Sequence, residues 1–396
     1  PTGVSSWTTI CTDNASPYSC SFDTTGVTDG LYDFRAVATD NAGYSQTSTV
    51  TGRRIDNTAP TGTTTDPGSP LTGSVSVTGT ASDAGGSGVA STTVQYRVAS
   101  TGSWVNICTQ AAASATCSWN TAALADGLYD LRTIATDVAG NTTATSTVVA
   151  NRRLDNVAPS ATMTAPATNL TGSVTLASTS SDAANGTGVA SVRYEYKPSA
   201  GSTWSTACTS ATTPFSCSFN TTAATDGLYD FRAVAIDGVN LSGTSAAVTS
   251  RRIDNTAPTA TMGALAANLT GSVSLTSTLA DSGTGVASAQ YQYKLTSDSS
   301  WTNACSSSTT PYSCSLNTAS LSDGLYDFRV VATDNVGNSG ASTPVFSRRV
   351  DNTNPTVTMG SVPAWVDASI ALTSTPADGG GIASVQYQYK LSTSGT

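Results

Sequence analysis

Stretches in which small apolar residues alternate with polar ones run along the whole chain. Residues 73–82 read GSVSVTGTAS and residues 89–98 read VASTTVQYRV, with the turn-forming DAGGSG between them. Residues 128–137, LYDLRTIATD, alternate in the same way after a second turn. A period of two indicates half-buried β-strands. No segment has the period, caps and length of an α-helix, and AALADG at 122–127 suffices for one helical turn. The pattern predicts an all-β protein.

The same pattern returns at regular intervals. The stretch DGLYD occurs at 29–33, 126–130, 226–230 and 323–327, and tryptophan recurs in step as Trp7, Trp104, Trp204 and Trp301. The interval of 97–100 residues is too long for a solenoid repeat, which has about 20–50 residues. It is the length of a complete small β-sandwich. We therefore expect tandem β-sandwich domains arranged as an extended rod.

A second repeated stretch marks the domain boundaries. RRIDNTAP at 53–60 returns as RRLDNVAP at 152–159, RRIDNTAP at 251–258 and RRVDNTNP at 348–355. Its proline suits the entry to a new domain, because proline cannot donate a hydrogen bond to a β-ladder. We place complete domains at 58–156, 157–255 and 256–352. The C-terminal half of a domain then occupies 1–57, and the N-terminal half of another occupies 353–396.

The two half-domains together make about one period, and two interpretations stay open. The sequence is an arbitrary cut from a longer covalent repeat, or the tail of one chain completes the head of the next. An unpaired half would expose strand edges and one side of a core, which is an aggregation hazard. In both interpretations each half should adopt the fold of the matching half of 256–352.

The stretch DGLYDFRAVATDNAGYSQTSTV, followed by RRIDNTAPT, resembles the tandem bacterial immunoglobulin-like repeats of large cell-surface, extracellular-fibre and adhesin proteins. In LYDFRAVA the inward residues would be Tyr32, Phe34, Ala36 and Ala38, with Phe34 where an immunoglobulin strand has cysteine. Such a tyrosine matches the tyrosine corner of that fold, and its copies are Tyr129, Tyr229 and Tyr326. The resemblance implies immunoglobulin-like domains in an extracellular rod, and no enzymatic activity.

Eight cysteines form four pairs, each nine residues apart within one repeat: Cys11 and Cys20, Cys108 and Cys117, Cys208 and Cys217, Cys305 and Cys314. A zinc site would need closer cysteines or histidine partners, and a redox motif would need Cys-x-x-Cys. We therefore predict local disulfides and an oxidising compartment. Each bridge should fasten a hairpin-like edge segment, so that packing alone holds the core. A disulfide that closes a loop of this size contributes about 2–3 kcal/mol to stability.

Aspartates gather where each linker should meet two loops of the next domain. The candidate groups are Asp56, Asp83 and Asp137; Asp155, Asp182 and Asp237; and Asp254, Asp281 and Asp334. Converging carboxylates repel unless a cation separates them, and calcium takes six to eight oxygen ligands. Some bacterial immunoglobulin-like repeats stiffen their joints in this way, so we consider calcium at the joints. The alternative is that each aspartate forms its own turn and faces solvent.

Two other repeated features have structural interpretations. Asp33 and Arg35 should point outward from their strand, so that Asp33 pairs across strands with Arg53 or Arg54. Trp104 and its copies should pack on the sandwich or its disulfide, and a sugar-binding platform is the alternative. Glycines 85, 86 and 88 in GGSGVA fit a tight turn and not a dinucleotide site, because no helix follows.

Composition narrows the function classes. The 396 residues carry a formal net charge of −9, include no histidine, and have Glu195 as their one glutamate. This acidic balance argues against a nucleic-acid partner. The sequence contains no run of about 18 apolar residues, which is the length needed to span a membrane. Without histidine no set of nucleophile, base and orienting residue can be assembled, so we expect no enzyme and no cofactor beyond calcium.

We therefore expect a structural segment of a long extracellular or cell-surface fibre, acting as spacer, stalk or filament subunit. Its partners would be neighbouring repeats of the same or an identical chain, and lateral association of chains stays open. The alternative is an adhesive module that recognises a glycan or protein through its loops or tryptophan faces. Close similarity of all units favours the spacer, because a specialised binding unit should differ from its neighbours.

Overall fold

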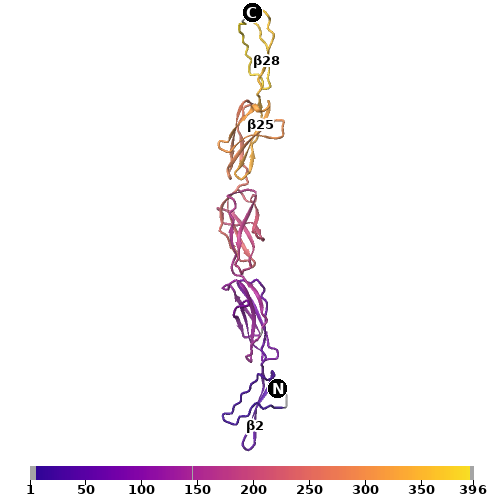
Figure 1. The fold of residues 1–396 in the computed structure, drawn as a ribbon, viewed down its shortest axis with the longest axis vertical. Coiled ribbons are helices and arrows are strands. Elements are labelled where there is room, and N and C mark those ends of the chain that lie inside the picture. Colours follow the sequence, from indigo (N-terminus) through magenta and orange to yellow (C-terminus); the bar gives the residue numbers. More distant parts are fainter. Residues whose placement is uncertain (1–5, 145, 393–396) are drawn as a thin grey trace.

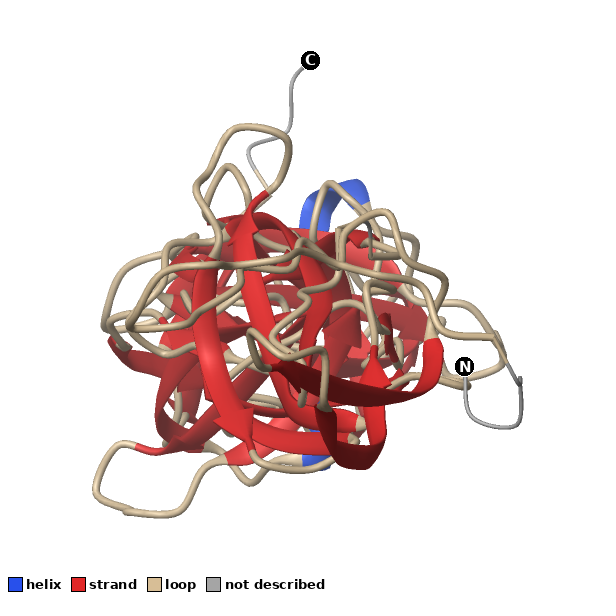
Figure 2. Cartoon of the chain, turned by 90° about the horizontal axis from the view of Figure 1, so that it is seen from below, coloured by secondary structure: helices blue, strands red, loops and turns tan. Residues whose placement is uncertain are grey.

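The computed structural model describes residues 6–144 and 146–392. Among them strands dominate, and the helical segments are two short 3-10 turns, η1 (Thr221–Ala223) and η2 (Thr318–Ser320). Figure 1 shows three sandwich units that follow one another in chain order, with a more open segment at each end. In the view along the chain, strands surround the centre and loops lie outside them (Figure 2). The expectation of an all-β chain is confirmed.

The segment 58–156 folds into two sheets. The three-stranded sheet has the order β3-β4-β7, with β3 (Thr61–Thr64), β4 (Ser74–Ser82) and β7 (Ser114–Asn120). The four-stranded sheet has the order β6-β5-β8-β9, with β6 (Val105–Gln110), β5 (Val89–Val98), β8 (Gly127–Asp137) and β9 (Val149–Leu154).

The next two segments repeat this arrangement. In 157–255 the smaller sheet contains β10 (Ser160–Met163), β12 (Ser173–Ser181) and β15 (Ser216–Asn220), and the larger contains β11 (Asn169–Leu170), β18 (Val248–Ile253), β16 (Gly227–Asp237), β13 (Val189–Pro198), β14 (Ser205–Ser210) and β17 (Ser242–Thr244). In 256–352 the smaller sheet contains β19 (Thr259–Met262), β21 (Ser272–Ala280) and β24 (Ser313–Asn317), and the larger contains β20 (Asn268–Leu269), β27 (Val345–Val350), β25 (Gly324–Asp334), β22 (Val286–Leu295), β23 (Thr302–Ser307) and β26 (Ser339–Ala341).

This strand order defines immunoglobulin-like β-sandwiches in tandem. In 58–156 the first, second and fifth strands form one sheet, and the fourth, third, sixth and seventh form the other. The ladders between these strands are antiparallel, and a short parallel contact joins β11 to β18 and β20 to β27 in the following units. Crossing from one sheet to the other along the chain brings the apolar faces of the two sheets together.

The core of each sandwich comes from the alternation seen in the sequence. Val77 in one sheet and Val94 and Leu131 in the other are fully buried in 58–156. The position of Leu131 is taken by Phe231 and Phe328 in the next units, both also fully buried. Full burial of such a side chain contributes about 1.5–3 kcal/mol. These aliphatic and aromatic residues therefore occupy the site of the immunoglobulin core cysteine.

The tyrosine expected at the corner of each unit makes the expected hydrogen bond. The Tyr129 hydroxyl donates to the carbonyl of Ala125 at 2.9 Å. The copies do the same at 2.8–3.1 Å, in Tyr32 to Thr28, Tyr229 to Thr225 and Tyr326 to Ser322. Each bond spans four residues and ties the sixth strand to the turn before it.

The expectation that the aspartate beside this tyrosine points outward and pairs with the repeated arginine pair is wrong. Asp130 is only 3% exposed, and its Oδ1 accepts a hydrogen bond from the Asn151 backbone N–H at 3.1 Å. The pairing of β8 with β9 shifts at a bulge between Tyr129 and Leu131, which turns this carboxylate toward the neighbouring backbone. The copies Asp33, Asp230 and Asp327 accept the matching N–H of Gly52, Ser250 and Ser347.

The two end segments contain fewer strands. In 6–57 the antiparallel pair β1 (Gly30–Thr39) and β2 (Ser45–Ile55) has the bulge seen at the matching place in the complete units. In 353–392 the antiparallel pair β28 (Thr356–Met359) and β29 (Ser374–Ala377) corresponds to β19 and β21. Residues 8–13, 19–23 and 382–391, which match β23, β24 and β22, are not in strands.

Candidate metal centres at the domain joints

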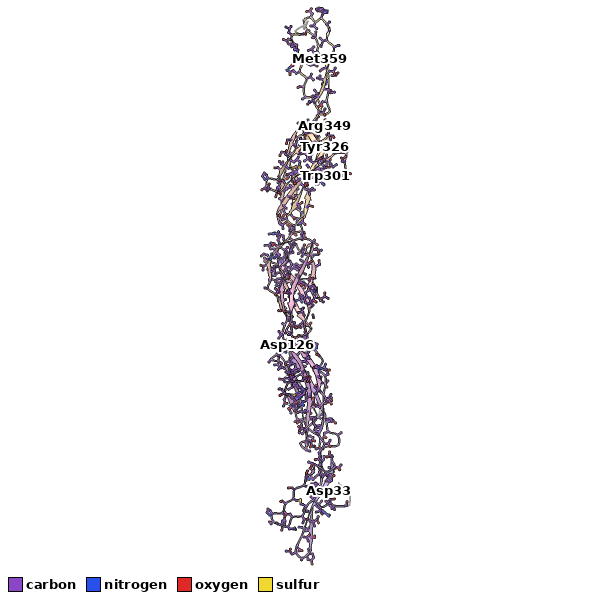
Figure 3. All side chains as sticks on the ribbon, viewed as in Figure 1. Asp33, Asp126, Trp301, Tyr326, Arg349 and Met359 are labelled. Atoms are coloured by element: carbon purple, nitrogen blue, oxygen red, sulfur yellow. A yellow bond between two sulfur atoms is a disulfide. The ribbon has the colours of Figure 1, made fainter. Side chains whose placement is uncertain are left out.

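Each linker contains an asparagine that binds back to the unit it leaves. The Asn156 backbone N–H donates to Asp126 Oδ1 at 2.7 Å, and its side-chain amide donates to the Thr121 carbonyl at 2.9 Å. Its Oδ1 accepts the Gly73 N–H at 3.0 Å. The same N–H to aspartate bond is made by Asn57, Asn255 and Asn352. Figure 3 shows Asp126 at the end of its unit, beside the joint.

The preceding aspartate binds forward, to the unit that follows. Asp155 Oδ2 accepts the Thr187 backbone N–H at 2.7 Å and the Thr187 hydroxyl at 2.6 Å. In the other joints Asp56 accepts the N–H of Ser87, and Asp254 accepts that of Thr284. These three donors lie in matching loops of the following units, between β4 and β5, between β12 and β13, and between β21 and β22. Two adjacent linker residues therefore hold opposite units.

Two further aspartates join the linker aspartate at each joint. The structure brings together Asp56 with Asp83 and Asp137, Asp155 with Asp182 and Asp237, and Asp254 with Asp281 and Asp334. In each group one carboxylate oxygen per residue lies within 4.8 Å of the others. The linker member and the member that ends the sixth strand are at most 8% exposed, and the third member is half-buried.

Local hydrogen bonds hold these carboxylates in place. Asp137 Oδ1 accepts the N–H groups of Gly140 and Asn141 at 2.7 and 2.9 Å, and thereby folds its own loop. The Asn141 side chain also donates to the Asp56 carbonyl at 3.0 Å, across to the linker. Asp83 Oδ2 accepts the Gly88 N–H at 2.6 Å. The aspartates form turns, as the alternative interpretation expected, but most of them are buried and not solvated.

Several carboxylate oxygens at the joints have no hydrogen-bond donor. Asp155 Oδ1 and Asp237 Oδ2 are buried and unpartnered, and these residues are 0% and 2% exposed. In the third joint Asp281 Oδ1 is likewise a buried oxygen without a hydrogen-bond donor. None of the ion pairs among the described residues includes a member of the three groups. Buried like charges this close destabilise the fold unless a cation compensates them.

The donor set selects the class of cation. Every side-chain oxygen that these groups offer is a carboxylate oxygen, with no histidine or cysteine among them. Such sets suit hard ions such as Ca²⁺, and softer transition metals prefer nitrogen or sulfur. Hydrogen bonds from Ser87, through its hydroxyl and its N–H, lower the pKa of Asp56. These bonds favour the charged form of that carboxylate.

The second arginine of the repeated pair also crosses the joint. Arg54 Nη1 donates to the Gly85 carbonyl at 2.6 Å, and Arg153 Nη1 donates to the Asn185 carbonyl at 2.6 Å. Both acceptors lie in the same loop of the following unit that the linker aspartate binds. This side chain connects two units instead of pairing with a strand aspartate as expected.

Each cysteine pair is joined within its own repeat. Cys108 lies in β6 and Cys117 in β7, with Cα atoms 5.7 Å apart. The other bonds are Cys11–Cys20, Cys208–Cys217 and Cys305–Cys314. Because β6 and β7 belong to different sheets, the bridge connects the two layers at one edge. The core is thus closed by a disulfide as well as by packing, which the expected hairpin would not have done. The four bonds indicate an oxidising environment.

The repeated tryptophan lies against positive charge. The Arg132 guanidinium carbon is 4.2 Å from the centre of the Trp104 ring, and that of Arg97 is 4.6 Å away. In the next units the corresponding cations are Arg232 over Trp204 and Arg329 over Trp301. A sugar stacking on the same ring face would have to displace the arginine.

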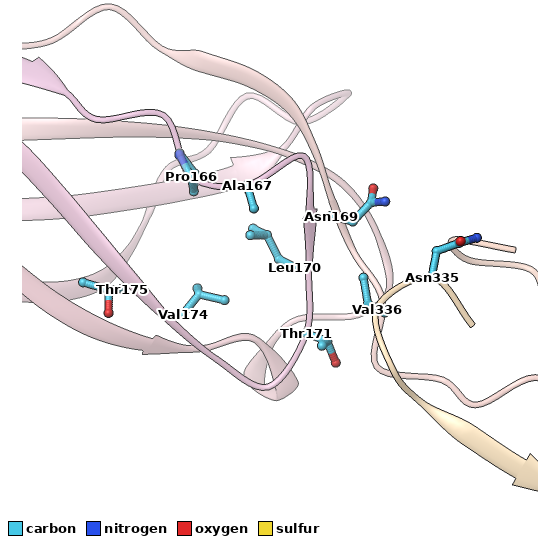
Figure 4. A pocket seen from close by; sticks show the side chains of 9 residues that line it. All are labelled: Pro166, Ala167, Asn169, Leu170, Thr171, Val174, Thr175, Asn335 and Val336. Carbon is cyan, nitrogen blue, oxygen red and sulfur yellow. The ribbon is translucent and has the colours of Figure 1, made fainter. Parts of the chain in front are cut away.

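A cleft of about 480 Å³ lies between the units 157–255 and 256–352. Figure 4 shows Leu170, Val174 and Pro166 on one side, with Asn335 and Val336 reaching it from the next unit. The Thr171 hydroxyl donates to Asn338 Oδ1 at 3.1 Å beside it. No residue that lines the cleft is ionisable, so it has no group for acid–base chemistry.

The linker asparagine and the first aspartate of DGLYD were not predicted as joint residues. Both recur in every repeat, so their signal was present as repetition. Their partnership was hidden because Asp126 and Asn156 are 30 residues apart. Hydrogen-bond partners at this separation do not follow from local propensity.

No family model matches the sequence, and no curated protein was found to be similar. Among solved structures, the chain is similar to a tetra-tandem repeat from the extending region of a large adhesion protein, with a TM-score of 0.32 and 19% identity over 85% of each chain. It is also similar to a structure from a 1.5-MDa bacterial ice-binding adhesin, with a TM-score of 0.31 and 16% identity over 71% of this chain and 92% of that one. The chain is also similar to fibronectin(III)-like modules of Clostridium thermocellum CbhA, with a TM-score of 0.29 and 18% identity over 48% of this chain and 92% of that one.

The class of protein follows from the chain's own strand order. Three described segments form tandem immunoglobulin-like β-sandwiches, each closed by a disulfide and preceded by a linker that binds both neighbours. No helix among the described residues is long and apolar enough to cross a membrane.

Proposed function

We propose that the chain is a structural segment of a long extracellular or cell-surface fibre, in which the repeats form a stiffened rod and calcium occupies the joints. The observation that supports this most is the two-way linker. At each of the three joints its aspartate accepts a hydrogen bond from the following unit, and its asparagine donates one to the preceding unit. Such contacts restrict bending between neighbours, as a spacer or stalk requires.

Calcium would act through the carboxylates left without donors. Asp155 Oδ1 and Asp237 Oδ2 come from the linker and from the following unit, so one ion held by both would join the units. Ca²⁺ also removes the repulsion among the three carboxylates, which the hydrogen bonds of the loops leave uncompensated. The fibre would then be stiff where calcium is abundant, as it is outside cells.

Calorimetric titration of the whole chain with CaCl₂ tests this proposal. We expect binding at three joints, a higher melting temperature with calcium, and a smaller maximum dimension in X-ray scattering after chelation, because the joints then bend. The double variant Asp155→Asn/Asp237→Asn should lose one binding equivalent. The control Asp298→Asn removes an exposed carboxylate outside the three groups and should bind like the parent chain. Identical melting and scattering with calcium and with chelator would refute calcium at the joints.

A further inference from the structure

One position in the loop after the sixth strand differs between the joints. The loop reads DVAGN at 137–141, DGVNL at 237–241 and DNVGN at 334–338. Its last residue is Asn141 in the first joint and Asn338 in the third, but Leu241 in the second. An asparagine side chain offers two N–H donors and an acceptor oxygen, and a leucine side chain offers neither. The middle joint, which precedes the unit 157–255, therefore lacks an amide that both other joints have.

In the first joint this amide ties the linker to the unit that follows. The Asn141 side chain donates to the Asp56 carbonyl of the linker at 3.0 Å and to Asp137 Oδ2 at 2.9 Å. The same two bonds recur in the third joint at 3.1 and 2.8 Å, from Asn338 to the Asp254 carbonyl and to Asp334 Oδ2. A neutral donor thus satisfies a buried carboxylate and at the same time holds the linker against the loop.

The asparagine of the third joint reaches the preceding unit as well. Its Oδ1 accepts the Thr171 hydroxyl at 3.1 Å, and Thr171 lies where the units 157–255 and 256–352 meet (Figure 4). The Asn338 side chain therefore contacts the preceding unit, the linker and the following unit. These contacts need no ion.

At the middle joint the corresponding oxygens have no such donor. Asp237 Oδ2, which corresponds to the two carboxylate oxygens bound by asparagine, is buried without a partner, and so is Asp155 Oδ1 of the linker. Among the residues that the structure describes, no hydrogen bond joins this linker directly to the loop. The remaining connection runs through Thr187, whose hydroxyl donates to Asp155 and accepts the Gly238 N–H at 2.9 Å.

The three joints differ in how much negative charge stays uncompensated. In the middle joint the oxygens without donors belong to two residues that are 0% and 2% exposed. In the third joint one such oxygen remains, on Asp281, which is half-buried. In the first joint, within the described part of the chain, no oxygen of Asp56, Asp83 or Asp137 is buried without a donor. The need for a cation is therefore greatest at the middle joint.

We propose that the middle joint is a calcium-dependent hinge, while the first and third joints keep their angle with or without the ion. The inference rests on the proposed function, since it presupposes calcium at the joints, and it narrows the bending expected after chelation to one joint. One ion held by Asp155 Oδ1 and Asp237 Oδ2 would supply the direct link between linker and loop that Leu241 cannot make. After the ion leaves, repulsion drives these carboxylates apart, because a bend gives them access to water.

Distances across the middle and third joints measure the difference. Ala123, Ala223 and Ser320 are exposed and occupy matching positions in the three units. Spin labels attached there through noncanonical amino acids leave the disulfides intact. The pair 123 and 223 spans the middle joint, and the pair 223 and 320 spans the third. With calcium, both pairs in the whole chain should give narrow distance distributions. In chelator the width across the middle joint should at least double, and the width across the third joint should stay unchanged.

Exchanging the two residue types tests the amide itself. Leu241→Asn supplies the missing donor, so the distribution across the middle joint should stay narrow in chelator. Leu241→Ala removes the leucine without adding a donor and should behave like the parent chain. Asn338→Leu should make the third joint broaden in chelator as the middle joint does, and its melting transition in calcium checks that its unit folds. If that variant does not fold, the comparison of Leu241→Asn with Leu241→Ala decides, because neither change removes a side-chain hydrogen bond.

The possible failures of the two proposals can be told apart. Equal broadening of both joints in chelator would overturn the hinge and leave calcium binding in place. The same holds if the Leu241→Asn chain broadens as much as the parent. No effect of calcium on either pair, together with no heat of binding, would instead overturn calcium at the joints and the hinge with it.

Discussion

Asp126 and Asp130 are the first and last residues of the repeated pentapeptide DGLYD, and they make different hydrogen bonds. Asp126 accepts the backbone N–H of the linker residue Asn156. Asp130 accepts the N–H of Asn151 at the bulge and forms an ion pair with Arg97 at 2.9 Å. Asn151 has a φ of 59°, in the left-handed region. The carboxylate of Asp130 thus holds a backbone conformation that most residues avoid.

The bulge aspartate makes stability depend on pH. Burial raises the pKa of Asp230, but hydrogen bonds from Lys197, Ser199 and Ser250 outweigh it, so the pKa is lowered below 3.8. A carboxyl group whose pKa is lowered by folding stabilises the fold above its unfolded pKa, and this contribution is lost as pH falls through the folded pKa. Asp230→Asn should therefore cost about 1.5–3 kcal/mol at pH 7, with a smaller difference below about pH 3.8. Urea unfolding at both pH values measures this, with Asp298→Asn as the exposed control; an equal loss at both would contradict the assignment.

The corner tyrosine can be tested by removing one atom. Tyr229→Phe deletes the hydroxyl that donates to the Thr225 carbonyl at 2.9 Å. The ring is 5% exposed and would stay packed, so the cost should be that of the hydrogen bond, about 1 kcal/mol. Thermal unfolding of the chain should show one of its transitions lowered. Tyr18→Phe, at a residue that is 74% exposed, should leave every transition in place.

At the scale of elements, alternation was enough to predict strands and their faces, since it directly reflects which side meets the core. The bulge at Asp130 was not predicted, because a one-residue shift in pairing leaves no mark on the alternation of β8 itself. The disulfide was predicted from spacing, but not its connection of two sheets. That depends on β6 pairing with β5 while β7 pairs with β4, which is a choice between sheets.

The bridge between sheets should contribute measurably to each sandwich. Replacing Cys208 and Cys217 with serine removes a cross-link over nine residues and should destabilise its unit by about 2–3 kcal/mol, mainly by freeing the unfolded chain. Calorimetry should show one transition moved to lower temperature. The same change at Cys11 and Cys20, which lie exposed in the end segment, should leave the transitions of the complete units unmoved. If both double variants shifted them alike, the bridge would not be acting within its own sandwich.

At the scale of the whole molecule, the joints decide whether repeats behave as independent beads or as a stiff fibre. The sequence pointed to the aspartates there because they recur in step with the strands. The sequence did not indicate that the linker and loop carboxylates would be buried away from solvent, because burial at a joint depends on how closely two units approach. Asp155 is fully buried although aspartate on a linker is ordinarily solvated.

The linker asparagine provides the last test, which needs no metal. Asn156→Ala removes the side-chain bonds to the Thr121 carbonyl and the Gly73 N–H, which leaves the Gly73 N–H without this acceptor, while the Thr121 carbonyl keeps the Leu124 N–H. We expect a cost of about 1–3 kcal/mol to the unit 58–156 and a wider range of angles to its successor, because the linker then keeps only its backbone bond to Asp126 on that side. Scattering from the full chain in chelator should show a broader distance distribution than the parent. Asn185→Ala, at an exposed loop residue that contributes its backbone carbonyl to the joint, keeps that contact and should scatter like the parent. A broader distribution in both variants, or in neither, would mean that the asparagine does not set the stiffness of the joint.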